Sequence, residues 1–251
     1  LAIQIVGFFA IFARLLDKYD PGMAAWQSLF HSVSGFNNAG FVIFPISHDI
    51  IFFKTDGIVI ASIATLIFVG SISYLVVMDL FAYKFNFRKY TLNSKIVLTT
   101  TLFLSLISFG VFYFGEFSNV STFASFGWFE KIVYSLFQSI SSRTAGFSLV
   151  DMSQVSEHTN VLTMILMFIG GASASTAGGI KVNTFAVLLI AVLSSISGRT
   201  HATVFGREIP QPQIYRALTV LILGMAMVFG VSFFLTISEG FPFIQILFET
   251  V

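Results

Sequence analysis

Long apolar stretches alternate with short polar segments along the chain. A bilayer core about 30 Å thick needs roughly 20 apolar residues of helix, so the longer stretches predict membrane-spanning helices. They cover residues 1–13, interpreted as a truncated span, and residues 57–83, 96–115, 160–193 and 217–238. The pattern therefore predicts an all-α membrane protein.

Two shorter helical segments lie between the predicted spans, at residues 26–36 and 128–142. Each is too short to cross a bilayer, which suits a re-entrant half-helix. Each ends in a turn of small and polar residues: Asn37, Asn38, Ala39 and Gly40 form the first turn, and Arg143, Thr144, Ala145 and Gly146 form the second turn. The order of span, half-helix, turn and span therefore recurs, with an offset of about 106 residues.

Gly40 and Gly146 occupy matched positions in the two units. Taken alone, either glycine reads as an ordinary turn residue that supplies a positive φ angle. Matched glycines after half-helices favour another role, because such a turn lets successive backbone carbonyls replace the water of a desolvated cation. The C-terminal end of each half-helix carries partial negative charge, which also favours a cation. The two turns are therefore candidate cation ligands.

The stretch at residues 160–193 is 34 residues long. As one helix it would extend about 51 Å, well beyond the bilayer core. A break is therefore expected at its small-residue loop, which consists of Gly170, Gly171, Ala172, Ser173, Ala174, Ser175, Thr176, Ala177, Gly178 and Gly179. Two interpretations stay open: close helix packing by small residues, or a flexible loop below the turns that blocks or opens an ion path.

Two charged residues near these segments have alternative roles. Arg143 either braces the second turn by donating to carbonyl groups or pairs with a loop acid at the membrane interface. Lys181 either places a positive barrier at the small-residue loop or reaches for the cytoplasmic surface. By contrast, the matching stretch at residues 57–83 is expected to continue as ordinary apolar helix.

Basic residues gather in two linkers, at residues 82–95 and 194–216. They are Lys84, Arg88, Lys89, Lys95, Arg199, Arg207 and Arg216. The excess of Lys and Arg in cytoplasmic loops predicts that both linkers face the cytoplasm and that both glycine turns face outward. The linkers are then candidate docking sites for a soluble regulator, with anionic lipid as the alternative.

Composition agrees with this class and excludes others. Hydrophobic residues make up 56% of the chain and charged residues 10%, whereas a soluble domain carries about 25% charged residues. The net charge of +1 is too small to suggest nucleic acid as a partner, and the absence of cysteine excludes disulfides and thiolate metal sites.

Three motifs together carry a resemblance to a known family. Residues 34–41, 142–147 and 170–181 are similar to those of the Trk/Ktr/HKT superfamily of potassium transporters, most closely the membrane subunits of bacterial Ktr systems. The resemblance implies helix, re-entrant pore helix, helix units around one pore, as in potassium channels. It makes residues 1–83 the second unit, residues 96–193 the third with an interrupted second helix, and residues 217–251 the truncated start of the fourth.

The same resemblance implies roles and partners. Residues 37–40 and 143–146 become a selectivity filter that binds potassium through backbone carbonyls, and residues 170–179 with Lys181 become a gating loop. It further implies a homodimer in a bacterial plasma (inner) membrane, a cytosolic nucleotide-binding regulatory ring of the KtrA-like type, and sodium as a coupling or activating ion. No covalently bound cofactor is expected. Because two turns cannot enclose an ion, the chain is expected to be part of a longer subunit.

Two other function classes compete with potassium uptake. A secondary transporter for a small organic solute also uses broken helices, although it does not require a re-entrant turn in each unit. An enzyme is not expected, because the chain lacks a convergent set of acid, base and nucleophile. A phosphate-binding loop is excluded by spacing, since Ile180 separates Gly179 from Lys181 and Val182 follows the lysine.

Overall fold

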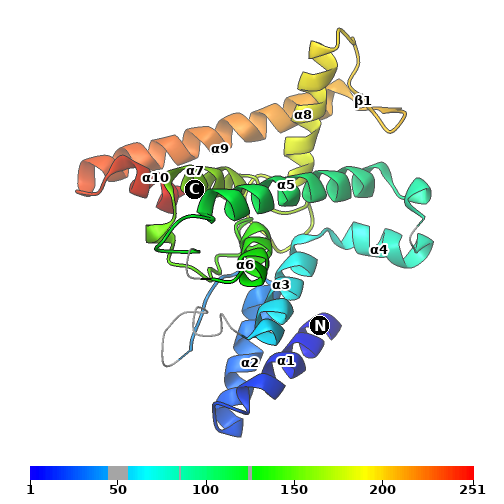
Figure 1. Ribbon diagram of the computed structural model, residues 1–251. Coiled ribbons are helices and arrows are strands. Elements are labelled where there is room, and N and C mark those ends of the chain that lie inside the picture. Colours follow the sequence, from blue (N-terminus) through cyan, green and yellow to red (C-terminus); the bar gives the residue numbers. More distant parts are fainter. Residues whose placement is uncertain (45–55, 85, 124–125) are drawn as a thin grey trace.

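The computed structural model describes residues 1–44, 56–84, 86–123 and 126–251, and helices dominate it (Figure 1). In chain order they are α1 (Ala2–Leu15), α2 (Pro21–Phe36), α3 (Gly57–Ser71), α4 (Tyr74–Tyr83), α5 (Leu92–Glu116), α6 (Trp128–Ser141), α7 (Glu157–Phe168), α8 (Val182–Ile196), α9 (Gln211–Ser238) and α10 (Phe243–Thr250). Short 3-10 turns lie at Phe87–Lys89 and Met152–Gln154. A small antiparallel hairpin, β1 (Thr203–Val204) and β2 (Arg207–Glu208), joins α8 to α9.

The first three helices pack against one another and are fixed by local caps. Asp20 accepts a hydrogen bond from Met23 N at the start of α2, where Pro21 suits the first helical position. Asp56 caps α3 in the same way and also pairs with Arg14 of α1, with 3.1 Å between Nε and Oδ2. This ion pair fixes the end of α1 beside the start of α3.

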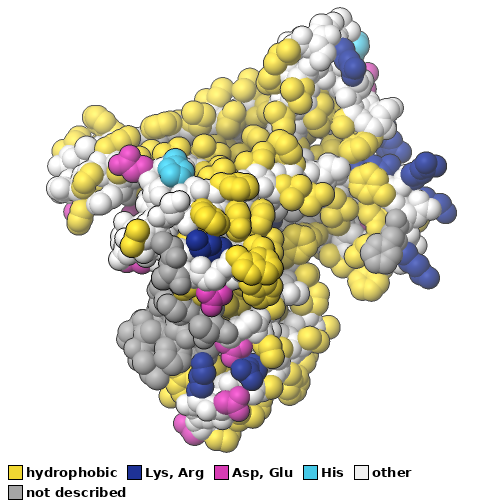
Figure 2. Space-filling view, viewed as in Figure 1, with side chains coloured by type: hydrophobic (Ala, Val, Ile, Leu, Met, Phe, Trp, Pro, Cys, Tyr) yellow, Lys and Arg dark blue, Asp and Glu magenta, His cyan; other side chains and the backbone are white. Residues whose placement is uncertain are grey.

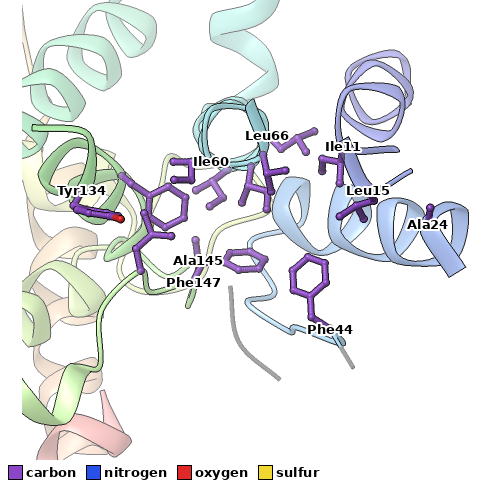
Figure 3. Close-up of a cluster of buried hydrophobic side chains, with 14 of the residues drawn as sticks. Ile11, Leu15, Ala24, Phe44, Ile60, Leu66, Tyr134, Ala145 and Phe147 are labelled. Atoms are coloured by element: carbon purple, nitrogen blue, oxygen red, sulfur yellow. The ribbon is translucent and has the colours of Figure 1, made fainter. Parts of the chain in front are cut away.

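The main apolar cluster joins the two units (Figure 3). Ile11 and Leu15 come from α1, and Leu66 comes from α3. Across the cluster, Tyr134 of α6 and Phe147, just after the second turn, are also buried. Burying such side chains is worth about 1.5–3 kcal/mol each, so this cluster holds the two half-helix units together.

The stretch at residues 57–83 corrects the sequence prediction, because it is not one continuous helix. α3 and α4 are bent by 95° where they meet (Figure 1). Ser73 accepts a hydrogen bond from Leu75 N and so caps α4 as a new helix. The carbonyl of Ser71 accepts a hydrogen bond from Ala172 N, a residue far along the chain. Contacts with a distant loop therefore override the helical propensity of an apolar sequence.

Among the residues that the structure describes, two helices are long and apolar enough by length and composition to cross a membrane: α5, with 25 residues, and α9, with 28. The bent pair of α3 and α4 passes the same test when taken together. Exposed hydrophobic side chains cover much of the face seen in Figure 2. A soluble protein rarely exposes such large apolar patches, so this surface is suited to lipid and to further protein. The chain is a multi-pass membrane protein.

A buried carboxylate ties the end of α5 to the start of α7. Glu116 is 1% exposed, and its two oxygens accept four hydrogen bonds. The donors are Asn119 Nδ2 at 2.7 Å, Thr122 Oγ1 at 2.8 Å, Ser156 N at 3.0 Å and Thr159 Oγ1 at 2.7 Å. Because every acceptor position is used, Glu116 has a structural role: it joins the end of α5 to the start of α7 and has no acceptor left for a ligand.

Candidate functional site

The two half-helices hold the chain that leaves each turn by the same hydrogen bond. Ser34 Oγ of α2 donates to the carbonyl of Phe41 at 2.9 Å, and Ser141 Oγ of α6 donates to the carbonyl of Phe147. The serines precede the turns at matched places in the repeat, and the phenylalanines directly follow Gly40 and Gly146. The repeated sequence contains this signal, although only the structure reveals what the serines do.

His31 stabilises the segment that follows the first turn. Its ring is fully buried and stacks on Phe44 with 3.9 Å between ring centroids. Nδ1 lies 2.7 Å from the carbonyl oxygen of Gln27, and Nε2 accepts a hydrogen bond from Ile43 N at 3.3 Å. One nitrogen therefore donates and the other accepts, which fixes a single neutral tautomer. His31 positions the backbone and does not act as a metal ligand.

The backbone of the two turns is unusual in the same way. In the first turn Asn38 has φ +52° and Gly40 has φ +74°. In the second, Thr144 has φ +74° and Gly146 has φ +79°. Asparagine and glycine tolerate positive φ, whereas a β-branched threonine there is a clear outlier. Such strained backbone persists only where the surroundings hold it, and it clusters at functional sites.

The two turns meet, although they lie more than 100 residues apart in the sequence. A Cβ atom added to Gly40 would lie 2.6 Å from the carbonyl oxygen of Ala145 and 2.9 Å from Cα of Gly146. A Cβ atom on Gly146 would in turn lie 3.2 Å from Cα of Gly40. Only glycine at Gly40 allows this approach, so the two turns form one backbone surface.

The small-residue segment forms a closed loop between α7 and α8. Ile169 and Ile180 make a parallel bridge at its neck. Ile180 N donates to the carbonyl of Phe168 at 2.8 Å, and Gly170 N donates to the carbonyl of Ile180 at 3.0 Å. The loop therefore leaves and returns at one place, while α7 and α8 continue on either side of it.

This loop contacts both turns directly. Thr176 Oγ1 accepts a hydrogen bond from Asn38 Nδ2 at 2.9 Å, in the first turn. Gly178 N donates to Thr144 Oγ1 at 3.0 Å, in the second turn. The carbonyl of Gly70 accepts a hydrogen bond from Thr176 N at 3.1 Å and lies 2.8 Å from Thr176 Oγ1. The loop is thus fastened to the turns and to the bend between α3 and α4.

Other loop residues bond within the loop or to α8. Ser175 Oγ donates to the carbonyl of Ala172 at 2.7 Å, and Ser173 N donates to Asn183 Oδ1 at 2.9 Å. Lys181 Nζ donates to the carbonyl of Ala177. The Lys181 side chain therefore folds back onto the loop and does not extend toward a membrane surface.

Arg143 lies in the protein interior and not at an interface. Its side chain is 1% exposed, and its Nε and Nη2 atoms have no hydrogen-bond partner among the residues that the structure describes. Burying guanidinium nitrogens that have no hydrogen-bond partner is costly. Asn37 and Ala39 are exposed in the first turn, and Gly146 is exposed in the second.

The sequence-predicted residues thus gather at one location, made of two turns and one loop. Within the described ranges, no group of three or more His, Cys, Asp or Glu side chains is placed to hold a metal ion. The two turns and the loop contain no acidic residue, so their oxygen atoms belong to backbone carbonyls and to the neutral side chains of Asn, Ser and Thr.

The fold and this site define a class of multi-pass membrane proteins built from repeated helix, re-entrant half-helix, helix units. The family model for TrkH, described as a cation transport protein, matches residues 1–251. The chain belongs to this family. A crystal structure of the potassium transporter TrkH from Vibrio parahaemolyticus shares the fold, with a TM-score of 0.75 at 20% identity over 98% of this chain and 51% of that one.

Curated relatives agree with the family assignment. The chain is 37% identical over 250 residues to Ktr system potassium uptake protein B of Bacillus subtilis (strain 168), covering 100% of this chain and 56% of the relative. It is 33% identical to potassium/sodium uptake protein NtpJ of Enterococcus hirae, over 96% of this chain and 53% of the relative. It is 31% identical to Ktr system potassium uptake protein B of Vibrio alginolyticus, over 100% of this chain and 55% of the relative. The chain therefore spans about half the length of the curated relatives it matches.

Proposed function

We propose that the protein containing this chain takes up potassium ions across the plasma membrane, through a central pore with a selectivity filter of backbone carbonyls. The observation that carries the proposal is the contact between Gly40 and Gly146, which brings two matched turns to one point. Two turns can surround an ion on one side only. In this proposal, further turns from the remainder of a longer subunit complete the ring of carbonyls around the ion.

The physical basis of ion binding is the arrangement around the turns. Phe36 ends α2 and Ser141 ends α6, so each half-helix directs its partly negative C-terminal end toward its own turn. Carbonyl oxygens there replace the water that a desolvated cation gives up. Potassium is the substrate that the names of the Bacillus and Vibrio relatives give. Sodium acts as a coupling or activating ion in this proposal, and no covalently bound cofactor takes part.

The small-residue loop gates this path in the proposal. It lies against both turns and makes neutral hydrogen bonds that are each worth about 1 kcal/mol. A loop held by a few such bonds has closed and open forms that differ by only a few kcal/mol. A partner outside the membrane then shifts the balance between the two forms.

Rubidium uptake separates this function from the alternative, a secondary transporter for a small organic solute. Cells that lack their own potassium uptake systems would express the full-length protein that carries this chain. We expect these cells to accumulate labelled rubidium, with unlabelled potassium competing, and to take up no labelled amino acid above vector-only cells. Amino-acid uptake without rubidium uptake would instead favour the solute transporter.

The two basic linkers lie beside each other in the structure. The ring of Phe87 in the first linker lies 6.0 Å from the ring of Phe205 in the β1–β2 hairpin. Lysine and arginine side chains gather around these elements at the right of Figure 2. We infer that a cytosolic regulatory ring of the KtrA-like type docks on this surface of a homodimeric membrane subunit. Anionic lipid is the competing partner for the same charges.

Charge reversal tests the docking surface. The double variant Arg88→Glu, Lys89→Glu in the full-length protein is expected to reduce binding of the purified regulatory ring by about ten-fold in detergent, where lipid is largely absent. The variant Arg88→Lys, Lys89→Arg keeps both charges and serves as the control. Binding assays at low salt are the measurement, because exposed charges are screened at high ionic strength. Undiminished binding by the reversed variant would assign the surface to lipid.

A further inference from the structure

Asn38 and Thr144 form a matched pair that links the turns to the loop. Each precedes the glycine of its turn by two residues, and each has a positive φ angle. Each also uses its side chain to bond the loop: Asn38 Nδ2 donates to Thr176 Oγ1, and Thr144 Oγ1 accepts from Gly178 N. The same position of each unit therefore carries both the strained backbone and the contact with the loop.

The second turn depends most on this contact. Thr144 adopts φ +74°, which a β-branched residue rarely does. Its hydroxyl oxygen receives the hydrogen bond from Gly178 N at 3.0 Å. A strained conformation persists only where neighbouring contacts hold it in place. Displacing residue 178 would remove one of the contacts that hold Thr144, two residues before Gly146.

Thr176 makes the corresponding connection at the first turn. Its Oγ1 lies 2.8 Å from the carbonyl oxygens of both Phe36 and Gly70, in addition to accepting from Asn38. A hydroxyl has one hydrogen, so it donates to only one of these two carbonyls at a time. Thr176 therefore sits between the end of half-helix α2, the bend after α3 and the first turn.

We propose that the loop and the two turns act as one hydrogen-bonded unit, in which Asn38 and Thr144 are positioning residues for ion selectivity. Movement of the loop then relaxes both turns, so opening the path and changing ion preference are coupled. Such coupling is reciprocal, which means that the ion held at the turns also biases the position of the loop. This inference rests on the proposed function and adds that the gate sets the geometry of the filter.

Two variants of the full-length protein test the coupling. Thr144→Val keeps the β-branched shape but removes the acceptor for Gly178 N, and Thr176→Val removes the hydroxyl that Asn38 bonds. Each is expected to raise basal rubidium uptake and to lower the preference for potassium over sodium. The preference is expected to fall by about five-fold in Thr144→Val, which loses one hydrogen bond, and by more in Thr176→Val, which loses both the bond from Asn38 and the bond to a carbonyl. Preference is measured as the ratio of potassium and sodium concentrations that halve rubidium uptake.

Matched controls separate coupling from loosening of the loop alone. Ser175→Ala removes a hydroxyl that bonds Ala172 inside the loop and contacts neither turn, so its ion preference is expected to match the unmodified protein. Thr144→Ser keeps the acceptor and is expected to retain the preference that Thr144→Val loses. Size-exclusion profiles in detergent verify that each variant folds.

The outcomes distinguish this inference from the proposed function. Unchanged ion preference in either valine variant, with a normal size-exclusion profile, would overturn the coupling and leave potassium uptake intact. An equal loss of preference in Ser175→Ala would also overturn it, because the effect would then belong to the loop in general. Absence of rubidium uptake by the unmodified protein would instead refute the proposed function itself.

Discussion

Gly40→Ala in the full-length protein is expected to weaken potassium preference over sodium by at least about ten-fold. The added Cβ would lie 2.6 Å from the carbonyl oxygen of Ala145, a backbone atom that cannot rotate away. The positive φ of +74° adds strain, since an alanine in the left-handed region costs about 1–2 kcal/mol. The first turn must therefore move away from the second, which displaces the carbonyls of both. Competition of sodium and potassium with rubidium uptake measures the change.

Two further glycine variants make this test specific. Gly146→Ala meets Cα of Gly40 at 3.2 Å and has φ +79°, so we expect a similar but smaller loss of preference. Gly110→Ala lies inside α5 and serves as the control, because a Cβ there would have no atom within 4 Å apart from the neighbouring backbone of its own helix. Alanine is favoured over glycine inside a helix, so this variant should fold at least as well. If Gly40→Ala and Gly146→Ala both kept the original ion preference, the assignment of the turns as the filter would be wrong.

The membrane class and the repeated units could be predicted from the sequence because both depend on local patterns. Apolar length indicates what crosses a bilayer, and the matched positions of Gly40 and Gly146 indicate a repeat. The break in the 34-residue apolar stretch could also be predicted, because the stretch is too long for one span and contains ten consecutive small residues, four of them glycine. Each of these features can be recognised from the order of residue types alone, without knowledge of contacts in three dimensions.

The bend between α3 and α4 could not be predicted in the same way. Residues 72–73 contain neither glycine nor proline, and apolar sequence continues on both sides. The bend exists because the carbonyls of Gly70 and Ser71 accept hydrogen bonds from a loop about 100 residues later in the chain. Such a contact has no local signature, although Ser73 is a typical helix-capping residue.

The contacts that organise the candidate site also had to be seen in three dimensions. Repeat alignment places Ser34 opposite Ser141 and Asn38 opposite Thr144, but it does not say what these side chains bond. The structure shows that one pair holds the segment after each turn and the other pair holds the loop. Repeats therefore identify which positions are equivalent, and packing decides what each equivalent pair does.

Deleting residues 173–175 from the loop of the full-length protein is expected to raise potassium flux by about ten-fold and to make it independent of the cytosolic regulator. The deletion removes two hydrogen bonds that these residues make outside the loop: Ser173 N donates to Asn183 Oδ1, and Tyr74 N donates to the carbonyl of Ala174. Two neutral hydrogen bonds are together worth about 2 kcal/mol, enough to shift a two-state loop by more than ten-fold. The bridge between Ile169 and Ile180 lies outside the deletion, so the neck of the loop is kept.

A variant with three glycines in place of residues 173–175 is the matched control for loop length. It keeps a chain of the original length below the turns and retains the backbone groups that bond Asn183 and Tyr74, so we expect flux closer to that of the unmodified protein. Rubidium uptake in the presence and absence of the regulator measures both variants. A shortened loop that abolished flux in a correctly folded protein would mean that these residues pack the helices together. The gate would then lie elsewhere, and close packing by small residues would be the correct interpretation of residues 170–179.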